Sequence, residues 1–137
     1  MSLSRLLTPG ADLRALAREL DVPVLAGLQH QGDLSVIPAK MVGSYCPPGT
    51  AVPAAGLPVL RGGGADGNTH LLLASGRVLF RSREPTPKKL ALGYLVVTDW
   101  AEAYLVHPEH GNTGIAPGRY VLRRKREYSE ELRLVMD

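Results

Sequence analysis

Glycine and proline interrupt this chain so often that long helices are excluded over most of its length. The 137 residues include 15 glycines and 11 prolines, together about a fifth of the chain against an ordinary share of about 12%. Both residue types break helices and favour turns, and they are scattered along the sequence. The pattern predicts short strands joined by turns, which is typical of a small β-barrel or a β-sandwich.

One amphipathic helix is expected, at the N-terminus. Its apolar residues recur at the spacing of a single helical face: Leu13, Leu16, Ala17 and Leu20. Thr8 is placed to cap this helix, and Pro23 ends it because the residue before a proline is disfavoured in a helix. We expect a single domain over residues 1–137, with a short helical segment over 1–21 and a β-rich body over 22–137.

The β-rich body is predicted from short apolar runs between turn residues. Strands are expected over residues 33–37, 57–61, 70–74, 77–81, 92–98, 103–107 and 119–126. Ser75-Gly76 has the composition of a two-residue hairpin turn. Residues 61–68 (RGGGADGN) predict a flexible loop and lack the residue order of a phosphate-binding loop. The strands are too short and too closely spaced for βαβ units, so the fold class is mainly β, with a barrel and a sandwich both open.

Charge and cysteine content exclude several classes of protein. The formal net charge is +3, and the single cysteine excludes an internal disulfide or a metal site built from several cysteines. Cys46 precedes two prolines and is expected to be an inert thiol. No apolar run is long enough to span a bilayer, and the N-terminus lacks the pattern of a signal peptide. We therefore expect a soluble, cytoplasmic protein with no membrane partner.

Histidines near strand ends are the first candidate for chemistry. His70, His107, Glu109 and His110 could meet at one end of a small β-fold, with His30 and Asp33 completing the set. Imidazole and carboxylate groups would bind a divalent transition metal such as zinc, iron or manganese. The same groups could act in acid/base catalysis, since imidazole titrates near neutral pH. The alternative is a set of ordinary loop histidines that are solvated or hydrogen-bonded.

The basic C-terminal strand is the second candidate. It carries Tyr120, Arg123, Arg124, Lys125 and Arg126, with Tyr128 beyond. Alternation along a strand places Tyr120, Leu122 and Arg124 on one face and Val121 and Arg123 on the other. Such a strand could follow a phosphate backbone while a tyrosine stacks on bases, or it could contact a protein partner. The alternative is a solvated edge strand protected from aggregation by its charges. Trp100 and Tyr104 are expected to pack in the core or at its rim.

The C-terminal third resembles a group of small uncharacterised bacterial and phage-encoded β-rich proteins. The resemblance rests on three stretches: Gln31-Gly32-Asp33, the HxEH segment His107–His110, and PGRYVLRRKREY over residues 117–128. Members of the group carry a Gly-His-x-His segment in the middle of the chain, whereas this chain has His70 with Asn68 in place of the other histidine. The resemblance implies a bacterial or phage context and no particular activity.

No complete catalytic signature is present in the sequence, so a binding function is the leading hypothesis. We expect an accessory module that binds a protein or nucleoprotein partner. One alternative is a metal-dependent or acid/base enzyme that uses the histidine and glutamate residues. The other is a domain that binds single-stranded nucleic acid through the basic C-terminal strand.

Overall fold

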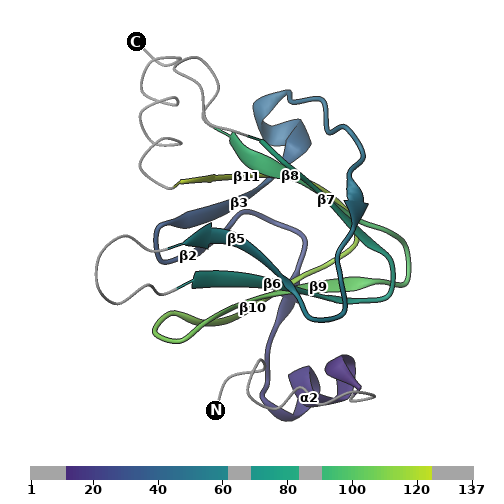
Figure 1. The fold of residues 1–137 in the computed structure, drawn as a ribbon, viewed down its shortest axis with the longest axis vertical. Helices are drawn as coiled ribbons and strands as arrows, with labels where there is room; N and C mark the ends of the chain where they lie inside the picture. The colour runs from purple at the N-terminus through teal and green to yellow at the C-terminus, as the bar shows by residue number, and fades with distance from the viewer. Residues whose placement is uncertain (1–11, 62–68, 84–90, 125–137) are drawn as a thin grey trace.

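A β-sandwich forms the body of the protein, as the computed structural model shows for residues 12–61, 69–83 and 91–124 (Figure 1). One sheet has five strands, in the order β1 (Val24–Leu25), β10 (Gly111–Ile115), β9 (Glu102–His107), β6 (Thr69–Ser75) and β5 (Leu57–Arg61). The other has six, in the order β2 (Gln29–Gln31), β3 (Leu34–Pro38), β11 (Gly118–Arg124), β8 (Ala91–Val97), β7 (Val78–Ser82) and β4 (Thr50–Ala51). The mainly β prediction is confirmed, and the described strands form a sandwich and no closed barrel.

The main core lies between the two sheets. Alternate residues of the facing strands point inward because successive side chains of a strand lie on opposite faces. This core contains Leu34, Val36, Leu72, Val78, Phe80, Leu95, Val97, Ala101, Ala103, Leu105, Ile115, Tyr120 and Leu122. Both faces of the sandwich are covered in part, because smaller apolar clusters lie on the outer side of each sheet.

Helix α2 (Leu13–Glu19) covers the outer face of the five-stranded sheet. Leu13 and Ala17 are buried there, and Leu16 and Leu20 pack beside them as the helical spacing predicts. The N-cap is Asp12, whose carboxylate accepts hydrogen bonds from the backbone N–H groups of residues 14 and 15. The predicted cap, Thr8, lies outside the described residues.

The short 3-10 helix η1 (Ala39–Val42) and the segment after it cover the outer face of the six-stranded sheet. Ala39 and Cys46 form a small cluster there with Tyr94 and Val121. Proline explains this arrangement, because Pro38 ends β3 and Pro47 and Pro48 keep the following segment out of a ladder. The segment from Ala39 to Cys46, in which no strand is predicted, therefore covers this sheet.

Two predictions about strand pairing are wrong. Ser75-Gly76 does not close a hairpin, because β6 pairs with β5 and β9 while β7 pairs with β4 and β8. The chain instead crosses from one sheet to the other at this turn, where Gly76 has a φ of +85°. The basic strand is not an edge strand either, since β11 lies between β3 and β8.

Most predicted strands are confirmed within one or two residues, and several predictions fall outside the described residues. The latter are residues 62–68 of the loop predicted over 61–68 and the tail from residue 125 onward, including Lys125, Arg126 and Tyr128. In the ranges that are described, no helix is long and apolar enough to cross a membrane.

Candidate functional site

Three of the four histidines meet at one end of the five-stranded sheet. The antiparallel register of β6 and β9 pairs Leu71 with Val106, which brings the adjacent His70 and His107 side by side. Their ring centroids are 4.4 Å apart, and the ring of His110 lies 4.5 Å from that of His107. Sequence reasoning therefore predicted the convergence of these three side chains. We call them, together with Gln31, the histidine cluster.

Gln31 holds the histidine cluster together. Its side chain is 2% exposed, and its amide nitrogen donates to the backbone oxygens of Leu105 and Gly111, each at 2.9 Å. The same nitrogen lies 3.2 Å from the hydroxyl of Thr113. Its amide oxygen therefore faces Nδ1 of His70, at 2.9 Å, and accepts a hydrogen bond from the Nδ1–H group. Because Gln31 belongs to β2 and its partners to β6, β9 and β10, these bonds connect the two sheets.

His107 is held in the opposite tautomer. Its Nδ1 accepts backbone N–H groups from Glu109 and His110, both at 3.1 Å, so Nδ1 carries no proton and Nε2 carries it in the neutral ring. His70, by contrast, is protonated at Nδ1 and unprotonated at Nε2. In the neutral rings, Nε2 of His70 is thus a hydrogen-bond acceptor and Nε2 of His107 is a hydrogen-bond donor. Both rings are nearly buried, at 4% and 5% exposure.

The surroundings of His70 and His107 favour the neutral form of both rings. The pKa of His70 is lowered to about 4, mainly by burial and then by the neighbouring His107 and His110, while the charge of Asp33 opposes the shift. Burial and His110 also lower the pKa of His107. Proton uptake by His107 at Nδ1 would place its proton against two backbone donors, which gives a direct geometric reason for the low pKa.

His110 covers the cluster from the solvent side. It lies in the turn between β9 and β10, and its ring lies nearly parallel to that of His70, with an interplanar angle of 10° and a centroid separation of 6.4 Å. The ring also rests on the Gly32-Asp33 turn between β2 and β3. Gly32 has a φ of +57°, and a Cβ at this position would lie 2.4 Å from Cδ2 of His110. Glycine is therefore required both by the turn and by the covering ring.

The remaining predicted metal ligands do not join the three rings. His30 is exposed and its Nδ1 lies 2.8 Å from the hydroxyl of Ser35, while Asp33 and Glu109 are exposed and act on the rings through their charge. In the described part of the chain, no group of three or more His, Cys, Asp or Glu side chains is arranged to hold a metal ion. In addition, the unprotonated Nδ1 of His107 faces two N–H donors and is not free to bind a metal.

Within the described part of the basic strand, Tyr120 is not available for stacking on bases. Tyr120 is 1% exposed, and its hydroxyl donates to the backbone oxygen of Ala116 at 2.7 Å. Arg123 is half-buried and Arg124 is exposed, at the end of a central strand. The predicted alternation is confirmed, since Tyr120 and Leu122 enter the main core while Val121 joins the outer cluster.

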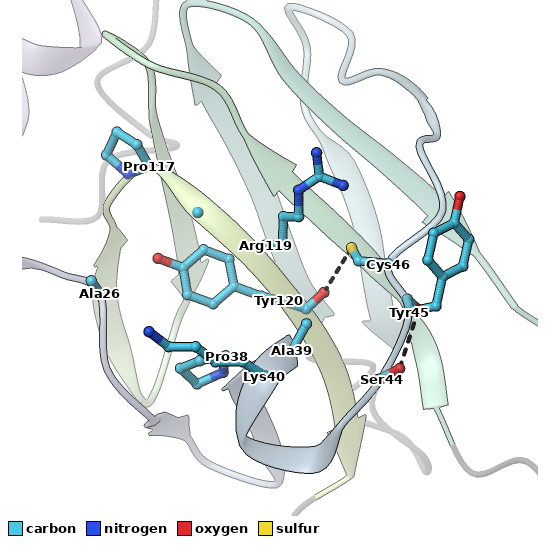
Figure 2. Close-up of a pocket in the computed structure, with 11 residues that line it drawn as sticks. Ala26, Pro38, Ala39, Lys40, Ser44, Tyr45, Cys46, Pro117, Arg119 and Tyr120 are labelled. Atoms are coloured by element: carbon cyan, nitrogen blue, oxygen red, sulfur yellow. Dashed lines mark hydrogen bonds between the residues drawn. The ribbon is translucent and has the colours of Figure 1, made fainter.

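A cleft of about 500 Å³ opens at the end of β3 and the start of β11 (Figure 2). We call it the β3–β11 cleft. It is lined by Ala26, Pro38, Ala39, Lys40, Ser44, Tyr45, Cys46, Pro117, Gly118, Arg119 and Tyr120. Its volume falls within the range of roughly 300–1,000 Å³ that is usual for ligand sites. Sequence reasoning did not identify this cleft, because its residues come from four separate stretches of the chain.

The floor of the β3–β11 cleft is uncharged. Pro38 and Pro117 have no backbone N–H, and the hydroxyl of Tyr120 is already bonded to Ala116. The thiol of Cys46 points to the backbone oxygens of Leu95 and Tyr120, at 3.6 and 3.7 Å. Burial raises the pKa of this thiol despite the nearby charge of Arg119, so Cys46 remains protonated at neutral pH. The predicted inert thiol is consistent with this environment.

Most of the large exposed apolar side chains belong to the chain segments that line the cleft. Among the described residues, five such side chains are exposed: Leu25, Leu28, Met41, Tyr45 and Trp100. Tyr45 lines the cleft and is 77% exposed, Met41 follows the lining residue Lys40, and the two leucines flank Ala26. The exception is Trp100, which lies in the β8–β9 turn and is 90% exposed, against its predicted packing role. Tyr104 is buried under α2, as predicted.

Comparison with known proteins identifies a family but no activity. A domain of unknown function, DUF8820, matches residues 30–125, which contain the histidine cluster and most of the residues that line the β3–β11 cleft. No curated protein and no solved structure matches the chain. Because the match spans well over half of the sequence, the chain belongs to the DUF8820 family.

Proposed function

We propose that this domain is a protein-binding module whose contact surface is the β3–β11 cleft and its rim. The observation that carries the proposal is a cleft lined by the exposed Tyr45, with three more of the five large exposed apolar side chains of the described residues, Leu25, Leu28 and Met41, within two positions of a lining residue in sequence. Exposed apolar groups that cluster next to a concavity mark interaction sites, whereas isolated ones are ordinary.

The residue types at the rim support a protein partner. Tyrosine, methionine and arginine are enriched in protein interfaces, and Tyr45, Met41 and Arg119 are all exposed around this cleft. The histidine cluster supports the proposal indirectly, because its tautomers are fixed by internal hydrogen bonds and its two deeper rings are nearly buried. Neither Nδ1 atom is free for a substrate, because each already takes part in one of those bonds.

Site-specific photo-crosslinking in cells of the source organism tests the proposal. A benzoylphenylalanine replaces Tyr45 in one variant and Trp100 in the matched control, since both are exposed aromatic residues. We expect a discrete protein adduct from position 45, which disappears when Met41→Asp is added, and none from position 100.

Three outcomes would contradict the proposal. An adduct only from position 100 would move the contact surface to the β8–β9 turn. An adduct from position 45 that nuclease removes would favour a nucleic-acid partner. No adduct from position 45 under conditions in which the protein is expressed and folded would show that this face binds no protein.

A further inference from the structure

Two cations and no carboxylate line the β3–β11 cleft. Lys40 and Arg119 are exposed among the described lining residues, and none of the others carries a charge at neutral pH. In Figure 2 the ring of Tyr120 lies between these two side chains, so the cations border the uncharged floor on two sides. Arg119 lies close enough to Cys46 for its charge to act on the thiol.

The floor itself offers an occupant few hydrogen-bonding groups. Its two prolines lack N–H groups, and the Tyr120 hydroxyl and the Cys46 thiol are directed to backbone oxygens. An apolar side chain can therefore enter the cleft without taking a partner from the Tyr120 hydroxyl or the Cys46 thiol. Polar recognition of the occupant therefore depends on the two cations of the rim, Lys40 and Arg119, which are complementary to a negatively charged group of the occupant.

From this combination we infer that the occupant of the β3–β11 cleft is an acidic segment of a partner protein, with one apolar side chain on the floor and a carboxylate bound between Lys40 and Arg119. The inference rests on the proposed function and names the chemistry of the partner. Nucleic acid fits the cleft less well, because its affinity depends on many phosphate contacts and this site offers two cations beside an apolar floor.

Selection from a random dodecapeptide library tests the inference on the purified full-length chain. The library is selected in parallel on the wild-type protein and on the Lys40→Glu/Arg119→Glu variant. Arg77→Glu/Arg81→Glu is the matched control, because it makes the same change of charge at two exposed arginines that do not line the cleft. A Met41→Ser/Tyr45→Ser variant removes the apolar rim and leaves the charges.

We expect peptides selected on the wild-type protein to combine Asp or Glu with a nearby Leu, Phe, Tyr or Trp. Synthetic copies should bind the arginine control as they bind the wild type. They should bind the Lys40→Glu/Arg119→Glu variant at least about tenfold more weakly, which is the effect of placing like charges across an interface. Their affinity should also fall as ionic strength rises, since the two cations are exposed.

Other outcomes separate the inference from the proposed function. Non-acidic peptides that lose affinity for the Met41→Ser/Tyr45→Ser variant would overturn the inference while the cleft remained a protein-binding surface. Peptides insensitive to both pairs of substitutions, or no enrichment on the wild-type protein, would count against both. Displacement of the selected peptides by single-stranded oligonucleotide at low salt would overturn the inference in favour of a nucleic-acid ligand.

Discussion

The histidine cluster and the β3–β11 cleft differ in the polarity of their side chains and in their exposure to solvent. The cluster is polar and nearly buried: Gln31 and the turn after β9 occupy the Nδ1 atoms of His70 and His107, and His110 covers the two rings. The cleft is apolar and open, with its few polar groups turned toward the protein. The comparison teaches that the residues most suggestive of chemistry stabilise this fold, while prolines, a lysine and a tyrosine form the exposed concave surface.

Replacing Gln31 should give the largest effect on stability. Gln31→Leu keeps the size of the side chain but leaves two backbone oxygens and Nδ1 of His70 without their partner, so the free energy of unfolding should fall by about 4 kcal/mol. Urea denaturation followed by circular dichroism measures the loss. The control is Gln29→Leu on the same strand, whose half-buried amide bonds two carbonyls and should cost about 1 kcal/mol. Equal losses would show that the cluster does not join the sheets.

Lowering the pH should have the next largest effect on the free energy of unfolding, through the histidine cluster. The pKa of His70 is about 4 in the folded protein and about 6.5 when unfolded, so below pH 6.5 the unfolded chain binds more protons. Stability is therefore complete above pH 7 and falls by about 2 kcal/mol at pH 5 and about 3 kcal/mol at pH 4, with the lowered pKa of His107 adding to the loss.

Denaturation curves at several pH values check this dependence on His70. His70→Gln should flatten the dependence between pH 6.5 and 5, whereas His30→Gln at an exposed position should leave it unchanged. A wild-type protein equally stable at pH 7 and pH 5 would contradict the burial of neutral histidines.

The contact between Gly32 and His110 should contribute a smaller amount. Gly32→Ala introduces a Cβ at a φ of +57° and against the ring, and should cost about 2 kcal/mol. Gly43→Ala is the matched control, since its φ is +59° with no atom within 4 Å of the added Cβ, and should cost about 1 kcal/mol. Adding His110→Ala to Gly32→Ala should remove the difference. Equal costs for both glycines would mean that His110 does not press on the turn.

Substitutions at the cleft rim should have the smallest effect on stability. Met41→Ser and Tyr45→Ser change side chains that are 54% and 77% exposed, so thermal or urea unfolding should shift by less than about 0.5 kcal/mol. Tyr104→Ser, at a tyrosine that is 1% exposed, should in contrast destabilise strongly. A large loss from either rim substitution would show that the rim supports the fold, which would weaken its assignment as a free surface.

The fold class and most strands follow from the sequence because period and turn residues determine them locally. Strands β5, β6 and β9 lie within one or two residues of their expected positions. Helix α2 buries the apolar face that its residue spacing predicts. Strand β10 was missed because three of its five residues, Gly111, Asn112 and Gly114, are types depleted in strands, and its pairing with β9 holds it extended. Pairing across the sheets was wrong at Ser75-Gly76, because one turn sequence serves a hairpin and a crossover equally.

The candidate sites were predicted unevenly. The meeting of His70 with His107 follows from their places at strand ends, whereas the role of Gln31 depends on bonds to three other strands that no local pattern encodes. The signal available was the Gln31-Gly32-Asp33 stretch, where a glycine turn follows a polar strand. The cleft was missed altogether, because exposure is a tertiary property and Lys40, Tyr45 and Arg119 are unremarkable in sequence.

The central position of β11 has a consequence for the order of folding. Residues 34–38 and 91–97 flank a place in the six-stranded sheet that residues 118–124 fill. Until that segment is added, β3 and β8 each present an unpaired edge, and the pairing that joins them spans most of the chain. Such long-range closure is slow, and unpaired edges are the sites at which incomplete chains aggregate. Ribosome-bound chains that lack β11 should therefore require protection along these two edges.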